Sequence, residues 1–257
     1  MSDIEIEVVD RVATVAINRP ALRNSMTLAM WRDMARTFER LSADAEVRGI
    51  ILTGAGQDFS TGADISEFGE VRADAEQATA YEVAVDACSD AIQSARQPTI
   101  AALHGYCLGG ACHMAMACDF RVADETAKIG IPAARLSIVY GVRSTQRLLA
   151  IVGLPAAKRI LFSAERLNSE EALRIGFVDR VGASALATAQ AFAATMAENA
   201  PLSIAGAKAI LNALAMGPGA LDLAEAERII AHAANSDDYR EGRDAFAAKR
   251  APEFKGR

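Results

Sequence analysis

Residues 99–124, which read TIAALHGYCLGGACHMAMACDFRVAD, constrain the fold of this chain more strongly than any other stretch. The apolar run 99–103 follows a proline and precedes a His-Gly pair, a pattern that predicts a short buried strand ending in a turn. Gly109 and Gly110 then precede small and apolar residues up to Cys118, which predict a buried helix. The stretch therefore predicts a strand, a glycine turn and a helix in direct succession.

Gly109 and Gly110 stand where the chain passes from that strand to that helix. Glycine lets backbone N–H groups approach a ligand closely. The first N–H groups of a helix lack intrahelical acceptors and lie at the positive end of the helix dipole. The turn is therefore a candidate site for a developing negative charge. The alternative interpretation is a tight connection that packs in the core.

The preceding part of the chain has the same alternation of strand, glycine turn and helix. The alternating residues 4–17 predict a β-hairpin, and GIILT at 49–53 predicts a buried strand. The loop 58–65 follows that strand, and its functional interpretation is a second backbone donor from Ala63 or its neighbour. The helices predicted here run from an N-cap at Thr27 to about Leu41, and over residues 70–96.

The later part of the chain becomes helical. A strand is predicted over 127–131, and the irregular segment 132–143 carries Arg135, Tyr140 and Arg143. The elements predicted after it are a helix over 145–152 capped by Ser144, a helix from Pro155 to about Ser163, a helix from Asn168 to Gly176, a strand over 177–181, and helices from Ala185 with breaks at Ala200-Pro201 and Gly217-Pro218-Gly219. These patterns predict an α/β protein with a helical C-terminal region.

The composition limits the class of protein. A chain of 257 residues suits one large domain or a domain with a helical extension. The net charge of −6 disfavours nucleic acid as the main partner. The four cysteines have no metal-binding spacing, so no metal site is predicted, and they favour a reducing cytoplasm. No signal peptide is evident, and no apolar run approaches the roughly 20 residues that span a bilayer.

Four segments resemble the crotonase superfamily, also called the enoyl-CoA hydratase/isomerase family. They are Asn18-Arg19-Pro20 with Asn24, the segment 59–65 (FSTGADI), the block 98–123, and Ala245-Phe246 with Lys249-Arg250. The resemblance implies a ClpP/crotonase-like spiral of ββα units over residues 1–195. It implies that residues 196–257 form a C-terminal helical region that supports homotrimers, often stacked as hexamers, and covers CoA.

The resemblance also implies the ligand and the site. Members of the family bind acyl-CoA thioesters and hold the thioester oxygen with two backbone N–H groups, which match Ala63 and Gly110 here. An enolate oxygen requires such fixed donors, and this fits the two glycine loops. No cofactor beyond the CoA portion of the substrate is expected. The positions that match CoA contacts are Arg23, Ala63, Asp64, Ile65, Phe246 and Lys249, the last two reaching CoA from a neighbouring subunit; the alternative for Arg23 and Lys249 is a solvated surface charge.

The chain departs from the family at its two acid/base glutamates. His113 occupies the position of the first, and Ala133 follows Pro132 where the second is expected. His113 is a candidate proton shuttle, with a satisfied core histidine as the alternative. Tyr140 resembles a tyrosine of the methylmalonyl-CoA decarboxylase branch, although Ala63 stands where that branch carries a histidine. Glu67, Glu70 and Glu82 are further carboxylates that the sequence alone does not place.

These observations predict an acyl-CoA enzyme that acts through an enolate held by Ala63 and Gly110. Its nominal class is enoyl-CoA hydratase/isomerase with an unusual acid/base set, so it is a lyase or an isomerase. The first alternative is a decarboxylase of a malonyl-type thioester that uses Tyr140 to orient the leaving carboxylate. The second is an acyl-CoA-binding protein without catalysis.

Overall fold

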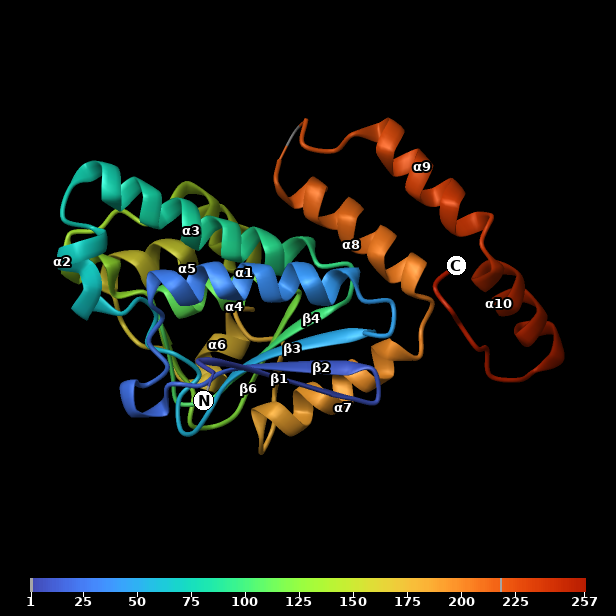
Figure 1. Cartoon of the computed structure of the whole chain (residues 1–257), viewed down its shortest axis with the longest axis horizontal. Coiled ribbons are helices and arrows are strands. Elements are labelled where there is room, and N and C mark those ends of the chain that lie inside the picture. The colour runs from blue at the N-terminus through green and yellow to red at the C-terminus, as the bar shows by residue number, and fades with distance from the viewer. Residues whose placement is uncertain (1, 218) are drawn as a thin grey trace.

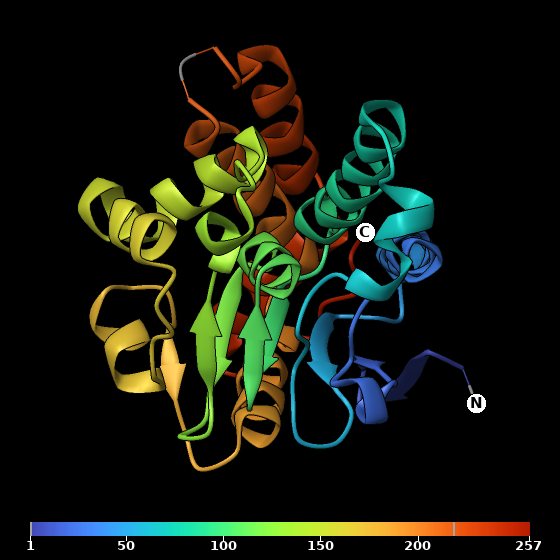
Figure 2. The ribbon, with the colours of Figure 1, turned by 90° about the vertical axis from the view of Figure 1, so that its left-hand side faces the viewer.

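A computed structural model describes residues 2–217 and 219–257, and its centre is a six-stranded sheet. The strand order is β1-β2-β3-β4-β6-β8, in which β1 pairs antiparallel with β2 and all other neighbours are parallel. The strands are β1 (Ile4–Val9), β2 (Val12–Ile17), β3 (Gly49–Gly54), β4 (Thr99–Leu103), β6 (Phe120–Ala123) and β8 (Arg180–Val181). Figure 2 shows β4, β6 and β8 side by side. A separate parallel pair joins β5 (Tyr106–Leu108) to β7 (Lys128–Gly130).

Helices cover both faces of the sheet (Figure 1). On one face lie α1 (Leu28–Ala43), α3 (Ala75–Ser94) and α4 (Gly110–Ala117), whose buried side chains join those of β2, β3 and β4 in the main core. On the other face α7 (Ala185–Ala197) packs small side chains against Ile51, Ile100 and Val122. Because the central strands are buried on both faces, they are continuous apolar runs rather than alternating ones.

Three helices continue the chain beyond the sheet: α8 (Pro201–Ala215), α9 (Leu223–Ala234) and α10 (Asp237–Ala248). They extend from the end of the molecule opposite α2 (Phe68–Val71), as Figure 1 shows. Pro218, part of one predicted break, lies outside the described residues. Within the described residues, no helix has the length and apolar character needed to cross a bilayer. The division of the chain near residue 195 stays a prediction.

The structure confirms several predicted elements and corrects others. Thr27 caps α1 by accepting a hydrogen bond from the Met30 N–H. The helix predicted over 70–96 is instead α2 and α3, separated by a loop, and the strand predicted over 177–181 is only β8. The two helices predicted after residue 144 form α5 (Val142–Ser163), which bends at Gly153, where φ is +73°. The prediction that Ser144 caps a helix is wrong, because α5 begins two residues earlier, after Gly141.

Candidate active site

The two glycine loops predicted from the sequence lie against each other. The Ser60 N–H donates to the Tyr106 carbonyl at 2.8 Å, and the Leu108 N–H donates to the Ser60 carbonyl at 3.1 Å. Between these loops the backbones are so close that a Cβ on Gly62 would lie 2.5 Å from the Leu108 carbonyl oxygen and 2.8 Å from the Gly110 nitrogen. Since Gly62 also has a φ of +84°, only glycine fits there without strain.

The backbone N–H groups of Ala63 and Gly110 lie at this junction. Gly110 is the first residue of α4, so its N–H has no intrahelical acceptor. Around Ala63, the Gly62 carbonyl accepts from the Met26 N–H and the Asp64 N–H donates to the Met26 carbonyl, a pattern that leaves the Ala63 N–H unused. Among the described residues neither N–H has a hydrogen-bond acceptor. Two unpaired donors therefore lie together at the positive end of a helix.

A cavity of about 160 Å³ lies next to these donors and contains all four predicted catalytic residues in its wall. They are Ala63, Gly110, His113 and Tyr140. The cavity lies between the loop that leads to α2, the helix α3, the start of α4 and the start of α5. The sequence prediction thus names residues from three separate segments that the fold brings to one place.

His113 lies in the cavity wall but is only 3% exposed. The Arg147 guanidinium donates to its Nε2 at 3.0 Å. Because a guanidinium can only donate, Nε2 must accept, which assigns the ring proton to Nδ1, 3.3 Å from the Ser144 Oγ. Burial and then the neighbouring Arg147 lower the pKa of His113 to about 3. The geometry therefore favours a neutral histidine that is held by hydrogen bonds.

This burial makes the stability of the protein depend on pH. Below pH 6.5 an unfolded chain binds a proton at residue 113 that the folded chain excludes, so stability falls as the pH falls. Between pH 7.5 and 5.0 we expect the wild type to lose about 2 kcal/mol more unfolding free energy than a His113→Gln variant, which keeps an acceptor for Arg147 but does not titrate. Urea unfolding of both proteins at the two pH values measures the difference. Equal losses would contradict the neutral, buried histidine.

Tyr140 contacts the glycine turn directly. Its hydroxyl donates to the Gly109 carbonyl at 3.2 Å, and its ring centroid lies 6.2 Å from that of His113. Burial raises the pKa of Tyr140 well above its usual value. The hydroxyl is therefore protonated at neutral pH. It is hydrogen-bonded to the residue that directly precedes the candidate donor Gly110.

The carboxylates near the cavity differ in their roles. Glu82 is the one carboxylate side chain in the wall formed by described residues, and it pairs with Arg72 at 3.0 Å. Glu67 instead accepts from the Leu28 N–H at the start of α1, and Glu70 is not a wall residue. Ala133 lies in the wall where a glutamate was expected, so it supplies no acid or base.

The positions expected to contact CoA fall into two groups. Near the glycine loops, Arg23 and Ile65 are exposed, whereas Asp64 forms an ion pair with Arg19 at 2.9 Å. Hydrogen bonding from Ser66, together with Arg19, lowers the pKa of Asp64 against the effect of its burial. Phe246 and Lys249 are exposed on α10 and at its C-cap, at the far end of the chain (Figure 1).

Sequence reasoning missed several wall residues. The Trp31 indole N–H donates to the Tyr81 hydroxyl at 2.9 Å, and both side chains are buried in the cavity wall. Arg72 and Ser144 also contribute to the wall. The available signal was the i, i+4 spacing of Tyr81 and Val85, which predicts a buried helix face but not an aromatic cavity wall.

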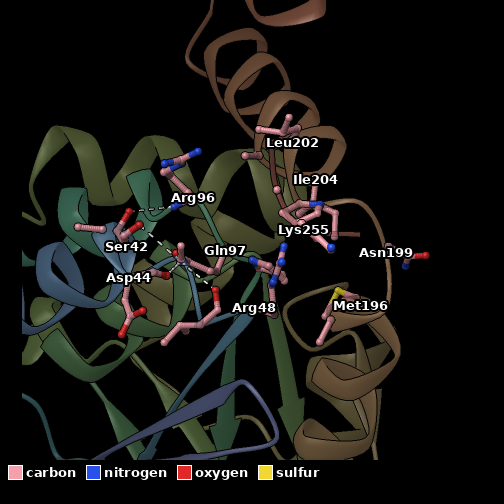
Figure 3. A pocket seen from close by; sticks show the side chains of 18 residues that line it. Ser42, Asp44, Arg48, Arg96, Gln97, Met196, Asn199, Leu202, Ile204 and Lys255 are labelled. Atoms are coloured by element: carbon pink, nitrogen blue, oxygen red, sulfur yellow. Dashed lines mark hydrogen bonds between the residues drawn. The ribbon is translucent and has the colours of Figure 1, made fainter. Parts of the chain in front are cut away.

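A second cavity, of about 100 Å³, lies next to the C-terminal tail (Figure 3). None of the predicted site residues lies in its wall. There the Gln97 side-chain amide donates to the carbonyls of Leu41 and Asp44, and the Arg48 guanidinium donates to the Phe254 carbonyl. These contacts join the segment before β4 to the end of α1, and the segment before β3 to the C-terminal tail. We interpret this cavity as a structural junction.

Comparisons with known proteins agree with this architecture. The family model described as enoyl-CoA hydratase/isomerase matches residues 7–257. The chain is 33% identical to a short-chain-enoyl-CoA hydratase of Clostridium acetobutylicum over 100% of this chain and 99% of that one. It is 32% identical to the 2,3-dehydroadipyl-CoA hydratase of Escherichia coli K12 over the full length of both.

Solved structures give the same result. A structure described as an enoyl-CoA hydratase/carnithine racemase from Magnetospirillum magneticum aligns with a TM-score of 0.94 at 35% identity, covering 100% of this chain and 97% of that one. The enoyl-CoA hydratase of Bacillus anthracis aligns with a TM-score of 0.90 at 29% identity over the full length of both chains. The crotonase-like fold expected from the sequence is thereby confirmed. The chain belongs to the enoyl-CoA hydratase/isomerase family, and it is an acyl-CoA enzyme of the crotonase superfamily.

Proposed function

We propose that the chain transforms an acyl-CoA thioester through an enolate whose oxygen is held by the N–H groups of Ala63 and Gly110. The observation that carries the proposal is the convergence of these two donors, which have no acceptor among the described residues. Fixed donors stabilise charge as it develops, and each can contribute about 3 kcal/mol to lowering the barrier. The reaction class is that of the enoyl-CoA hydratases and isomerases, with no cofactor beyond the CoA portion of the substrate.

The acid/base set distinguishes this chain within that class. Residues 113 and 133 carry no carboxylate, and loss of a positioned acid or base costs roughly 10² to 10⁴ in rate. His113 supplies a ring in which Nε2 is occupied by Arg147. We therefore propose that enolate stabilisation dominates catalysis, and that hydration is slow compared with an enzyme that carries both glutamates.

Decarboxylation of a malonyl-type thioester is the second candidate. This reaction requires stabilisation of the enolate but no carboxylate base. The observation in its favour is the Tyr140 hydroxyl, held on the cavity wall beside Gly110 by the Gly109 carbonyl. That hydroxyl stays protonated, and it would exchange its hydrogen bond to the Gly109 carbonyl for one to a substrate carboxylate.

The proposed assembly and CoA site extend beyond one chain. We propose that Arg23, Asp64 and Ile65 border CoA, and that Phe246 and Lys249 reach it from a neighbouring subunit of a homotrimer or hexamer. Support comes from the large apolar side chains exposed on the C-terminal helices, including Leu211, Leu223 and Ile230. We place the protein in the cytoplasm, where its four free, buried thiols stay reduced.

Turnover on three thioesters tests the proposal. Crotonyl-CoA, a 3-enoyl-CoA and methylmalonyl-CoA are incubated in parallel with the protein, and the products are followed by mass. We expect conversion of an enoyl-CoA. Decarboxylation of methylmalonyl-CoA with inert enoyl-CoAs would favour the second candidate. Binding of all three without turnover would contradict both and identify an acyl-CoA-binding protein.

A further inference from the structure

Tyr81 presents an unused hydrogen-bond donor to the cavity. Its side chain is 1% exposed, and its hydroxyl accepts a hydrogen bond from the Trp31 indole. The hydroxyl proton has no acceptor among residues 2–217 and 219–257. Burial raises the pKa of Tyr81 to about 12, so the proton stays in place at neutral pH. A buried O–H group without an acceptor is costly unless a ligand accepts from it.

Arg72 supplies a positive charge next to this hydroxyl. Its guanidinium carbon lies 5.1 Å from the centre of the Tyr81 ring and 4.9 Å from that of Phe68. The guanidinium forms one ion pair, with Glu82 at 3.0 Å, and no hydrogen bond to another described residue. Since a guanidinium has five N–H donors, most of them remain free for a planar anion.

These donors lie away from the reacting end of the acyl group. A Cβ on Gly110 would lie 3.1 Å from the Trp31 ring, so this indole packs against the oxyanion donor. The indole Nε1, two bonds from the Cζ2 atom nearest Gly110, donates to the Tyr81 hydroxyl along the same edge of the ring, and the Tyr81 ring lies under Arg72. The Trp31 edge and the Tyr81 ring therefore lie in succession between Gly110 and the guanidinium, an order that an acyl chain of several carbons can follow.

We propose that Arg72 and Tyr81 form a subsite for a carboxylate at the distal end of the acyl group, so that the substrates are CoA thioesters of dicarboxylic acids. The subsite rests on the proposed function, because it places an acyl-CoA in this cavity. In the absence of substrate, the Glu82 carboxylate is paired with the Arg72 guanidinium. The Glu82 side chain is 49% exposed and lies at the solvent edge, so a substrate carboxylate displaces it into water.

Binding of two matched thioesters tests the subsite without requiring turnover. Adipyl-CoA and hexanoyl-CoA have the same number of carbons and differ in the terminal carboxylate. We expect the wild type to bind adipyl-CoA about 10- to 100-fold more tightly in calorimetry, the range that charge-assisted hydrogen bonds supply. Arg72→Met removes most of this preference, and Tyr81→Phe reduces it several-fold. Neither variant weakens hexanoyl-CoA comparably.

Glu82→Gln is expected to change the preference for adipyl-CoA in the opposite direction from Arg72→Met. With its competitor neutralised, Arg72 binds the substrate carboxylate better, so the preference for adipyl-CoA rises. Arg36→Met, which removes an exposed arginine of α1 outside the cavity, is the matched control and leaves the preference unchanged.

Three results would overturn the subsite. They are equal binding of the two thioesters by the wild type, equal weakening of both by Arg72→Met, or a lower preference in Glu82→Gln. If the wild type turns over neutral enoyl-CoAs but does not discriminate, the subsite alone fails. If neither thioester binds, the proposed function fails with it.

Discussion

A Gly110→Pro variant is expected to lose about 10²- to 10³-fold in kcat on the best thioester substrate while remaining folded, because it deletes one oxyanion donor. Gly110 is the first residue of α4, where proline is tolerated since that N–H has no intrahelical acceptor. Steady-state kinetics with circular dichroism of the same preparation measures both expectations. KM should change less than kcat, since the donor acts mainly on charge that develops during the reaction.

Gly110→Ala is the matched control for this variant. It retains the N–H group but adds the same Cβ, 3.1 Å from the Trp31 ring, so it reports the contact of that Cβ with Trp31 while the donor is kept. We expect a loss of kcat clearly smaller than that of Gly110→Pro. If the two variants lose activity equally, displacement of Trp31 explains the effect, and Gly110 is not an oxyanion donor.

Arg147→Met is expected to lower the unfolding free energy by about 2 to 3 kcal/mol, because it removes the charge-assisted hydrogen bonds of a buried guanidinium. The Arg147 side chain is 5% exposed and donates to Asp90 at 2.8 Å, to Gln93 at 2.6 Å and to His113 at 3.0 Å. Methionine fills much of the volume of the aliphatic stem but makes none of these hydrogen bonds. Urea unfolding at pH 7.5 measures the loss.

Arg143 offers the control, since it pairs with the same Asp90 carboxylate from an exposed position. Arg143→Met should change stability by less than about 1 kcal/mol, as expected for a solvent-screened ion pair. A small effect in both variants would show that the guanidinium of Arg147 is not needed to hold α5 against α3 and α4.

The sequence predicted the parts of the site that depend on backbone chemistry. Ala63 and Gly110 were identified because glycine loops after buried strands can present backbone donors, and the resemblance favoured this interpretation over a tight core connection. His113 and Tyr140 were placed through the resemblance, and both lie in the cavity wall. Their roles in catalysis stay predictions, because position does not establish a proton transfer.

Side-chain networks between distant helices were not predictable. Arg147 and His113 are 34 residues apart, and nothing in either local pattern indicates that one donates to the other. Ser144 shows the same limit, because a serine before an apolar helical pattern is typical of an N-cap. In the fold the helix begins earlier, and the serine contacts His113 instead.

The hydrogen bond from Arg147 to His113 bears on what a carboxylate at position 113 could do. A glutamate restored at position 113 would face a buried guanidinium, and an opposite charge at that distance lowers a carboxyl pKa by about one to three units. The restored side chain would be a firmly ionised ion-pair partner and a poor proton donor. The charge state of a carboxylate at position 113 therefore depends on which residue stands at position 147.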